Sequence, residues 1–189
     1  MALHHHRMNI IKCLITLTGA TVIFVAATTV IADDVVPSRR TARFEVEFMK
    51  MMIDHHAMAV KMAKLCTDRA IHDELESLCH DLIAAQSAEI DEMQSWLHHW
   101  YGVSYEPHMS SKDRRLLRDL SKRHRKQFEI TFMRMMIEHH SVAIEEAEEC
   151  VDRAFHDELL KLCHNIIDTQ TAEVALLQDW LCDWYKKCH

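Results

Sequence analysis

The chain has very few of the residues that bend or end secondary structure, with two glycines and two prolines among 189 residues. Sheet proteins need many tight turns, and tight turns depend on glycine and proline. The scarcity of both, together with hydrophobic residues at 49% of the chain, indicates an all-α protein. The length suits one ordinary domain.

Positive charge is also scarce, and the formal net charge is -7. A protein that binds nucleic acid needs a basic face against the phosphates. The one basic run, Lys112–Lys126, fits the solvated surface of a connecting helix. We therefore expect no nucleic-acid partner.

Motifs of common enzymes are missing as well. The sequence has neither a glycine-rich phosphate loop nor a nucleophile elbow. A ferritin-like di-iron site takes a glutamate three residues before a histidine on each of two helices, and no histidine here has a glutamate at that position. We expect a protein that is not an enzyme, and a di-iron protein is the least favoured alternative.

What the chain does contain is an internal repeat. Phe48–Val60 reads FMKMMIDHHAMAV and Phe132–Ile144 reads FMRMMIEHHSVAI, an offset of 84 residues. Each copy has two stretches with apolar residues at helical spacing and a break between them, which predicts a helical hairpin. Two hairpins bury their apolar faces most simply as an antiparallel four-helix bundle.

These patterns divide the chain into segments. Residues 44–101 and 128–189 are the two helical-hairpin repeats, which together form one domain, and residues 102–127 connect them through a short helix. Residues 33–43 are expected to be a linker.

The first 32 residues have a different character. In residues 1–32 a basic start precedes an uncharged run over residues 13–32, which indicates a signal peptide or an N-terminal membrane anchor. Both alternatives predict an exported protein, periplasmic or secreted. In the second alternative an uncleaved helix would keep the protein anchored to the membrane through residues 13–32.

Six of the seven cysteines follow this N-terminal segment. In an exported protein an even number of cysteines favours disulfides over thiolate ligands for a metal. Two pairs have the same spacing in the two copies, and the two cysteines without repeat counterparts could pair with each other. The three expected pairs are Cys66 with Cys79, Cys150 with Cys163, and Cys182 with Cys188.

Polar residues interrupt the apolar stripe of the second helix in each copy. If the repeated cysteines face each other across antiparallel helices, His56 lies level with Glu89 and His140 with Glu173, since both helices rise about 1.5 Å per residue. The layer is either a buried hydrogen-bonded network or the outer shell of a metal site, and both remain open. The interrupting residues are Gln86, Glu89, Gln170 and Glu173.

Methionine and histidine lie at helical spacing along the first helix of each copy. Thioether and imidazole together select Cu(I) over hard ions, whereas the alternative is that methionine fills an irregular core. The second copy has Val142 and Glu146 in place of Met58 and Met62, so we expect the first copy to be the stronger site. The candidate ligands are Met51, Met52, His55, His56, Met58, Met62, Met135, Met136, His139 and His140; His98, His99, His108 and Met109 are next in line.

Taken together, these motifs resemble a known family. The segments that carry the resemblance read FMKMMIDHHAMAVKMA, then LCHDLIAAQSAEIDEMQSWL and WYG, within Arg43–Tyr185. They look like the exported helical-bundle family, a domain of unknown function, that includes CopM-type periplasmic copper-binding proteins. The resemblance implies a ferritin-like four-helix fold and copper binding by methionine and histidine, carried onto Met51, Met52, His55, His56, Met58 and their second-copy equivalents.

The resulting hypothesis is an exported metal-binding protein that binds copper, as Cu(I), for sequestration or transfer. The alternative is a disulfide-stapled extracellular interaction module in which the His/Glu layer is purely structural. The sequence therefore indicates a metal ion as the binding partner, and it identifies no protein partner.

Overall fold

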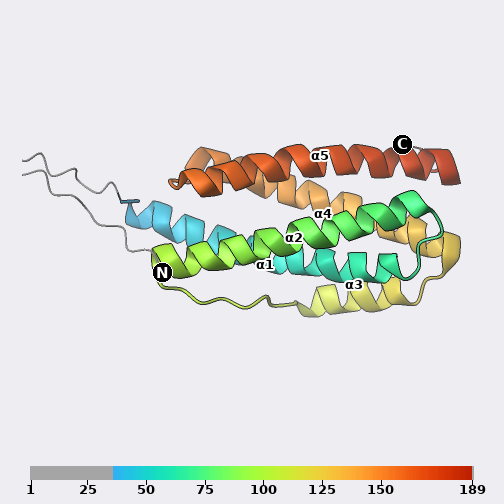
Figure 1. The fold of residues 1–189 in the computed structure, drawn as a ribbon, viewed down its shortest axis with the longest axis horizontal. Coiled ribbons are helices and arrows are strands. Elements are labelled where there is room, and N and C mark those ends of the chain that lie inside the picture. Colours follow the sequence, from blue (N-terminus) through green and yellow to red (C-terminus); the bar gives the residue numbers. More distant parts are fainter. Residues whose placement is uncertain (1–35, 189) are drawn as a thin grey trace, which may run out of the picture. The chain divides into compact units, whose positions relative to one another are not determined.

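The computed structural model describes residues 36–188, and this part of the chain is built from five helices (Figure 1). No strand occurs between residues 36 and 188, so the prediction of an all-α protein is confirmed. The expected signal peptide or anchor at residues 1–32 lies outside the described residues. The helices are α1 (Arg39–Thr67), α2 (Asp73–Tyr101), α3 (Ser111–Ser121), α4 (Arg125–Arg153) and α5 (Asp157–Tyr185).

The helices form two hairpins that pack on each other. α1 packs against α2 and α4 against α5, while α1 also packs against α4 and so joins the hairpins into a four-helix bundle. The short α3 lies alongside α1 and α4 (Figure 1). Two apolar clusters fill the bundle, and each combines residues of both hairpins, such as Leu82 with Leu181 and Met93 with Ile166. Burial of these apolar faces is the main favourable contribution to folding.

Two helices begin outside the boundaries expected from the repeat. α1 starts at Arg39, so residues 39–43 of the expected linker are helical. The Ser38 hydroxyl accepts a hydrogen bond of 3.1 Å from the backbone N–H of Thr41 and so caps the helix. α4 likewise starts at Arg125, inside the expected connecting segment. A helix begins where its free N–H groups find acceptors, whereas the repeat boundary marks only where the two copies stop resembling each other.

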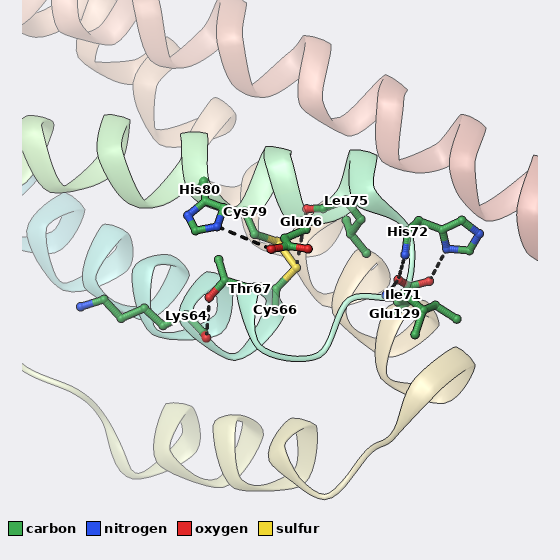
Figure 2. Close-up of a disulfide and its surroundings, with 10 residues drawn as sticks. All are labelled: Lys64, Cys66, Thr67, Ile71, His72, Leu75, Glu76, Cys79, His80 and Glu129. Atoms are coloured by element: carbon green, nitrogen blue, oxygen red, sulfur yellow. Dashed lines mark hydrogen bonds and ion pairs between the residues drawn. A yellow bond between two sulfur atoms is a disulfide. The ribbon is translucent and has the colours of Figure 1, made fainter.

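Three disulfides are present in the described part of the chain. The bonds Cys66–Cys79 and Cys150–Cys163 join the two helices of each hairpin near the connecting loop, with Cα atoms 6.1 and 6.2 Å apart. Figure 2 shows the first of these bonds. Both pairs have a sequence separation of 13. The third bond, Cys182–Cys188, closes the end of α5.

Two completely buried carboxylates hold the hairpins together. Glu129 of α4 accepts hydrogen bonds from the backbone N–H groups of Ile71 and His72 at 2.6 and 3.0 Å and lies 2.7 Å from His72 Nδ1 (Figure 2). The Tyr185 hydroxyl donates to the same carboxylate. We name this arrangement the Glu129 clamp. Because Ile71 and His72 belong to the first hairpin, the clamp crosses between the hairpins.

The equivalent arrangement, the Glu45 clamp, runs in the opposite direction. Glu45 of α1 accepts from the backbone N–H groups of Phe155 and His156 at 2.6 and 3.0 Å and lies 2.7 Å from His156 Nδ1, and the Tyr101 hydroxyl also donates to it. The His156 ring stacks on Trp100 with centroids 3.8 Å apart. Each hairpin therefore supplies a carboxylate that satisfies backbone groups of the other, which a buried charge requires.

Between residues 36 and 188, none of the helices combines the length and the apolar character that a transmembrane span requires.

Candidate metal centre

The first histidine of each His-His pair meets its counterpart where α1 packs against α4. The ring centroids of His55 and His139 are 3.5 Å apart, and the rings are tilted by 31°. The two residues hold equivalent positions in the two copies of the repeat. The sequence favoured the first copy as the stronger site, whereas the structure brings one imidazole from each copy to the same place.

Both imidazoles are held in the neutral form. Burial and the neighbouring rings of His56 and His140 lower the pKa of His55 to about 3. Burial and the ring of His55 also lower the pKa of His139 well below its usual value. Nδ1 of each ring is buried and has no hydrogen-bond partner among residues 36–188. A metal ligand must be a neutral imidazole with a free lone pair, so these two rings fit a metal ion.

Two grooves open beside this pair of rings. The first, which we name the Met51 groove, has a volume of about 260 Å³ and is lined by Met51, Met58, His55 and His139 among others. The second, the Met135 groove, has a volume of about 230 Å³ and is lined by Met135 together with Met58 and the same two histidines. Imidazole nitrogen and thioether sulfur thus lie together, which is the donor set that soft Cu(I) prefers.

The other candidate methionines lie deeper in the bundle. Met62 lines the Met135 groove from a position that is only 1% exposed. Met52 and Met136 are completely buried, and each packs into a different apolar cluster. Their places fit the packing alternative better than the ligand role.

Carboxylate, cysteine and histidine do not make a site by themselves in the described part of the chain. Among residues 36–188, no group of three or more such side chains is placed to hold a metal ion. The methionines that line the two grooves are the further candidate ligands beside His55 and His139.

The polar layer contains the contacts expected from helix register. His56 Nε2 and Glu89 Oε2 form a hydrogen bond of 2.7 Å. His140 Nε2 lies 2.7 Å from Glu173 Oε2 but without the alignment of a hydrogen bond. The prediction that His56 lies level with Glu89, and His140 with Glu173, is confirmed. The pairs adjoin the candidate centre, since the rings of His55 and His56 are only 6.2 Å apart.

The two predicted glutamines belong to the same layer. Gln86 and Gln170 are each 3% exposed, and the side-chain oxygen of each has no hydrogen-bond partner among the described residues. Both interpretations of this polar layer, a structural hydrogen-bonded network and the outer shell of a metal site, are compatible with the arrangement.

The grooves also contain acidic residues that the sequence did not indicate. Asp113 lines both grooves and Asp54 lines the Met51 groove. Asp54 accepts hydrogen bonds from the Tyr105 hydroxyl and the backbone N–H of His108, and Asp113 caps α3 through Ser110. Apolar periodicity within either copy does not predict that Asp54 and Asp113 lie at the grooves, because the connecting segment that brings them together lies outside the repeat.

The chain also matches a known protein family. Residues 45–181 match the family model described as a domain of unknown function, DUF305. The chain belongs to the DUF305 family. The resemblance drawn from the sequence motifs is thereby confirmed.

Solved structures similar to this DUF305 chain include forms of CopM. CopM in the Cu(I)-bound form has a TM-score of 0.67 at 30% identity, covering 75% of this chain and 97% of that chain. Its Cu(II)-bound form has a TM-score of 0.68 with the same identity and coverage. A DUF305 protein from Streptomyces coelicolor, described as a candidate secreted protein, has a TM-score of 0.66 at 26% identity and covers 74% of this chain and 91% of that chain. No curated protein matches the chain.

Proposed function

We propose that this protein is exported and binds copper as Cu(I), for sequestration or transfer and without catalytic turnover. The ligands are His55 and His139, with sulfur from Met51 and Met135. The observation that carries the proposal is the contact between two neutral, buried imidazoles, each with an unpartnered Nδ1, flanked by methionine on both sides.

The ligand chemistry supports Cu(I) more than other ions. Soft thioether sulfur favours Cu(I), whereas Mg²⁺ and Ca²⁺ take oxygen ligands. Asp54 and Asp113 already accept hydrogen bonds from Tyr105, His108 and Ser110, so these two carboxylates offer little to a hard cation. Similarity to CopM, which has been solved with Cu(I), Cu(II) and silver, supports a metal-binding role at the level of the family.

Two observations support export. Three disulfides in one chain are typical of an oxidising compartment. The similar Streptomyces coelicolor protein is described as a candidate secreted protein.

The test replaces both imidazoles. His55→Gln with His139→Gln should weaken Cu(I) binding by more than about 100-fold, which is the upper end of what losing a group that only supports a ligand costs. Competition with a Cu(I) chelator under anaerobic conditions measures the affinity, and circular dichroism reports whether the fold is kept. The matched control is His80→Gln with His164→Gln, an equivalent pair of exposed histidines on α2 and α5. An unchanged affinity in the His55 and His139 variant would contradict the proposal.

A second variant separates Cu(I) from other metals. Met51→Leu with Met135→Leu keeps the apolar volume and removes two sulfur atoms. We expect weaker Cu(I) and Ag(I) binding, with any Zn²⁺ binding unchanged because zinc prefers nitrogen and thiolate ligands. If the imidazole and methionine variants both kept full copper affinity, the copper site would lie elsewhere. If the unmodified chain bound no copper, the interaction-module alternative would be favoured instead.

A further inference from the structure

The first helices of the two copies, α1 and α4, differ at two methionine positions. Met58 and Met62 of the first copy are replaced by Val142 and Glu146 in the second. Met58 lines both grooves beside the His55–His139 pair, yet its second-copy equivalent, Val142, is an exposed apolar side chain. The additional sulfur therefore lies on one side of the bundle only.

That side is the one covered by the connecting segment. Asp54 holds the segment on α1, because its carboxylate accepts hydrogen bonds of 2.8 Å from the Tyr105 hydroxyl and 2.6 Å from the backbone N–H of His108. Burial and the bond to Asp54 raise the pKa of Tyr105 to about 12, so the hydroxyl keeps its proton. Gln94 Nε2 adds a bond of 2.7 Å to the carbonyl oxygen of Tyr105. The segment is thus fixed in place just before His108.

A third groove lies under this segment. We name it the His108 groove; it has a volume of about 260 Å³, and its lining includes Met58, His108 and Met109. His108 and Met58 also line the Met51 groove, so the two grooves share an imidazole and a thioether. His108 is exposed, Met109 is half-buried and Met58 is 5% exposed, so the donors run from solvent toward the interior.

We infer that Met58, His108 and Met109 form an accessory Cu(I) site, through which the ion exchanges between solvent and the His55–His139 pair. The inference rests on the proposed function, since it adds a second site on the path to the first. Two thioethers and one imidazole are soft and borderline donors suited to Cu(I). Lys61 and Lys64 line the same groove and disfavour a doubly charged ion more than a singly charged one.

The accessory site also gives a reason for the difference between the two copies. Of the two methionines that α1 has and α4 lacks, Met58 shares a groove with His108 and Met109 of the connecting segment, and Met62 shares one with Leu116 of α3. The second copy presents Val142 and Glu146 at those positions. A site completed by the connecting segment needs sulfur only on the copy that the segment covers.

The test is a variant that leaves the proposed central ligands untouched. His108→Gln with Met109→Leu should bind one Cu(I) fewer per protein than the unmodified chain. It should also exchange the remaining Cu(I) with a chelator more slowly. The matched control is His80→Gln with His164→Gln, which removes two exposed histidines on α2 and α5. Anaerobic titration with Cu(I), repeated with redox-inert Ag(I), gives the stoichiometry, and stopped-flow transfer to the chelator gives the rate.

The outcomes separate this inference from the proposed function. If the His108 and Met109 variant keeps the stoichiometry and the exchange rate of the unmodified chain, the accessory site is wrong, while loss of copper in the His55 and His139 variant would still support the central site. If the His55 and His139 variant keeps one Cu(I) that the additional changes at His108 and Met109 remove, the accessory site is supported directly. If the unmodified chain binds neither Cu(I) nor Ag(I), both proposals fail together.

Discussion

Adjacent histidines in this bundle have different environments although they share one sequence motif. Successive positions on a helix are turned by about 100°, so His55 faces α4 while His56 faces α2. The ring of His55 lies against His139, and the ring of His56 bonds to Glu89. The motif therefore places one imidazole against the other hairpin, where we propose that the metal binds, and one against a carboxylate, and the adjacent positions of the two histidines allow both.

The Glu45 clamp gives a stability prediction at a single residue. Burial by itself would raise the pKa of Glu45, but hydrogen bonds from Tyr101, Phe155 and His156 outweigh it and hold the pKa below its ordinary value of 4.5. Glu45→Gln removes the charge and should lower the free energy of unfolding at pH 7 by about 1–3 kcal/mol. Urea unfolding followed by circular dichroism measures this difference.

The same variant predicts a change in pH dependence. A carboxylate with a lowered folded-state pKa stabilises the protein above the unfolded pKa, and this contribution is lost as the pH falls from about 4.5 through the folded-state value. The difference between the unmodified chain and Glu45→Gln should therefore shrink on acidification through that range. Glu47→Gln, two residues along α1 and exposed, is the matched control. A difference that stayed constant from pH 7 to pH 3 would show that the carboxylate of Glu45 is not what the clamp depends on.

The contrast between Glu89 and Glu45 shows what the sequence can predict at this scale. The pairing of His56 with Glu89 follows from two antiparallel helices joined by a short loop, whose register the cysteine spacing fixes. Glu45 lies at the start of α1, where a glutamate ordinarily faces solvent, and its partners are 110 and 111 residues away. Contacts between hairpins depend on how the hairpins dock, and helical periodicity contains no information about that.

At the scale of elements, the contribution of each disulfide to stability can be compared between the two hairpins. Replacing Cys66 and Cys79 by alanine should lower the free energy of unfolding by about 3 kcal/mol, because the bond closes a loop with a separation of 13 in the unfolded chain. Replacing Cys150 and Cys163 should cost the same, since the separation is the same. Removing Cys182–Cys188 should cost less, about 2 kcal/mol, because its separation is only 6.

Urea unfolding of the three alanine pairs, without reductant, measures this order. Alanine is preferred to serine because it leaves no unpartnered hydroxyl in the core, where the four cysteines of the two hairpin disulfides are completely buried. Mass mapping of the unmodified exported protein provides the control for pairing. Free thiols at Cys66 and Cys79, or a larger loss from Cys182–Cys188 than from the hairpin bonds, would contradict the prediction.

The elements themselves could be predicted from the sequence more fully than the grooves. Four long helices and a short connecting helix follow from apolar periodicity and from breaks at turn residues such as Gly102, which ends α2 with a positive φ of 65°. The place of the connecting segment does not follow, because it is fixed by Asp54 accepting bonds from Tyr105 and His108, more than 50 positions along the chain. The sequence therefore identifies the candidate ligands, but it does not predict which of them lie together.

At the scale of the whole bundle, the two hairpins depend on each other. Glu45 of the first hairpin satisfies backbone groups of the second, and Glu129 of the second satisfies those of the first. The apolar clusters and the His55–His139 contact also combine both hairpins. A metal held at that contact would bind only the docked form and would stabilise it by mass action, by about 2.7 kcal/mol when the free ion is at 100 times its dissociation constant.

This dependence predicts that neither hairpin folds alone. In separate fragments 36–109 and 110–188, the first with its one disulfide formed and the second with its two, Glu45 and Glu129 would lose their partners in the other hairpin. An unpartnered buried carboxylate costs several kcal/mol. We expect weak helicity and no cooperative melting for either fragment, and recovery of both when the fragments are mixed. Thermal melting followed by circular dichroism measures this, with and without Ag(I). Ag(I) should raise the melting temperature of the mixture but not of a mixture whose second fragment carries His139→Gln. Cooperative melting of one fragment by itself, near the temperature of the intact chain, would show instead that each repeat is an independent unit.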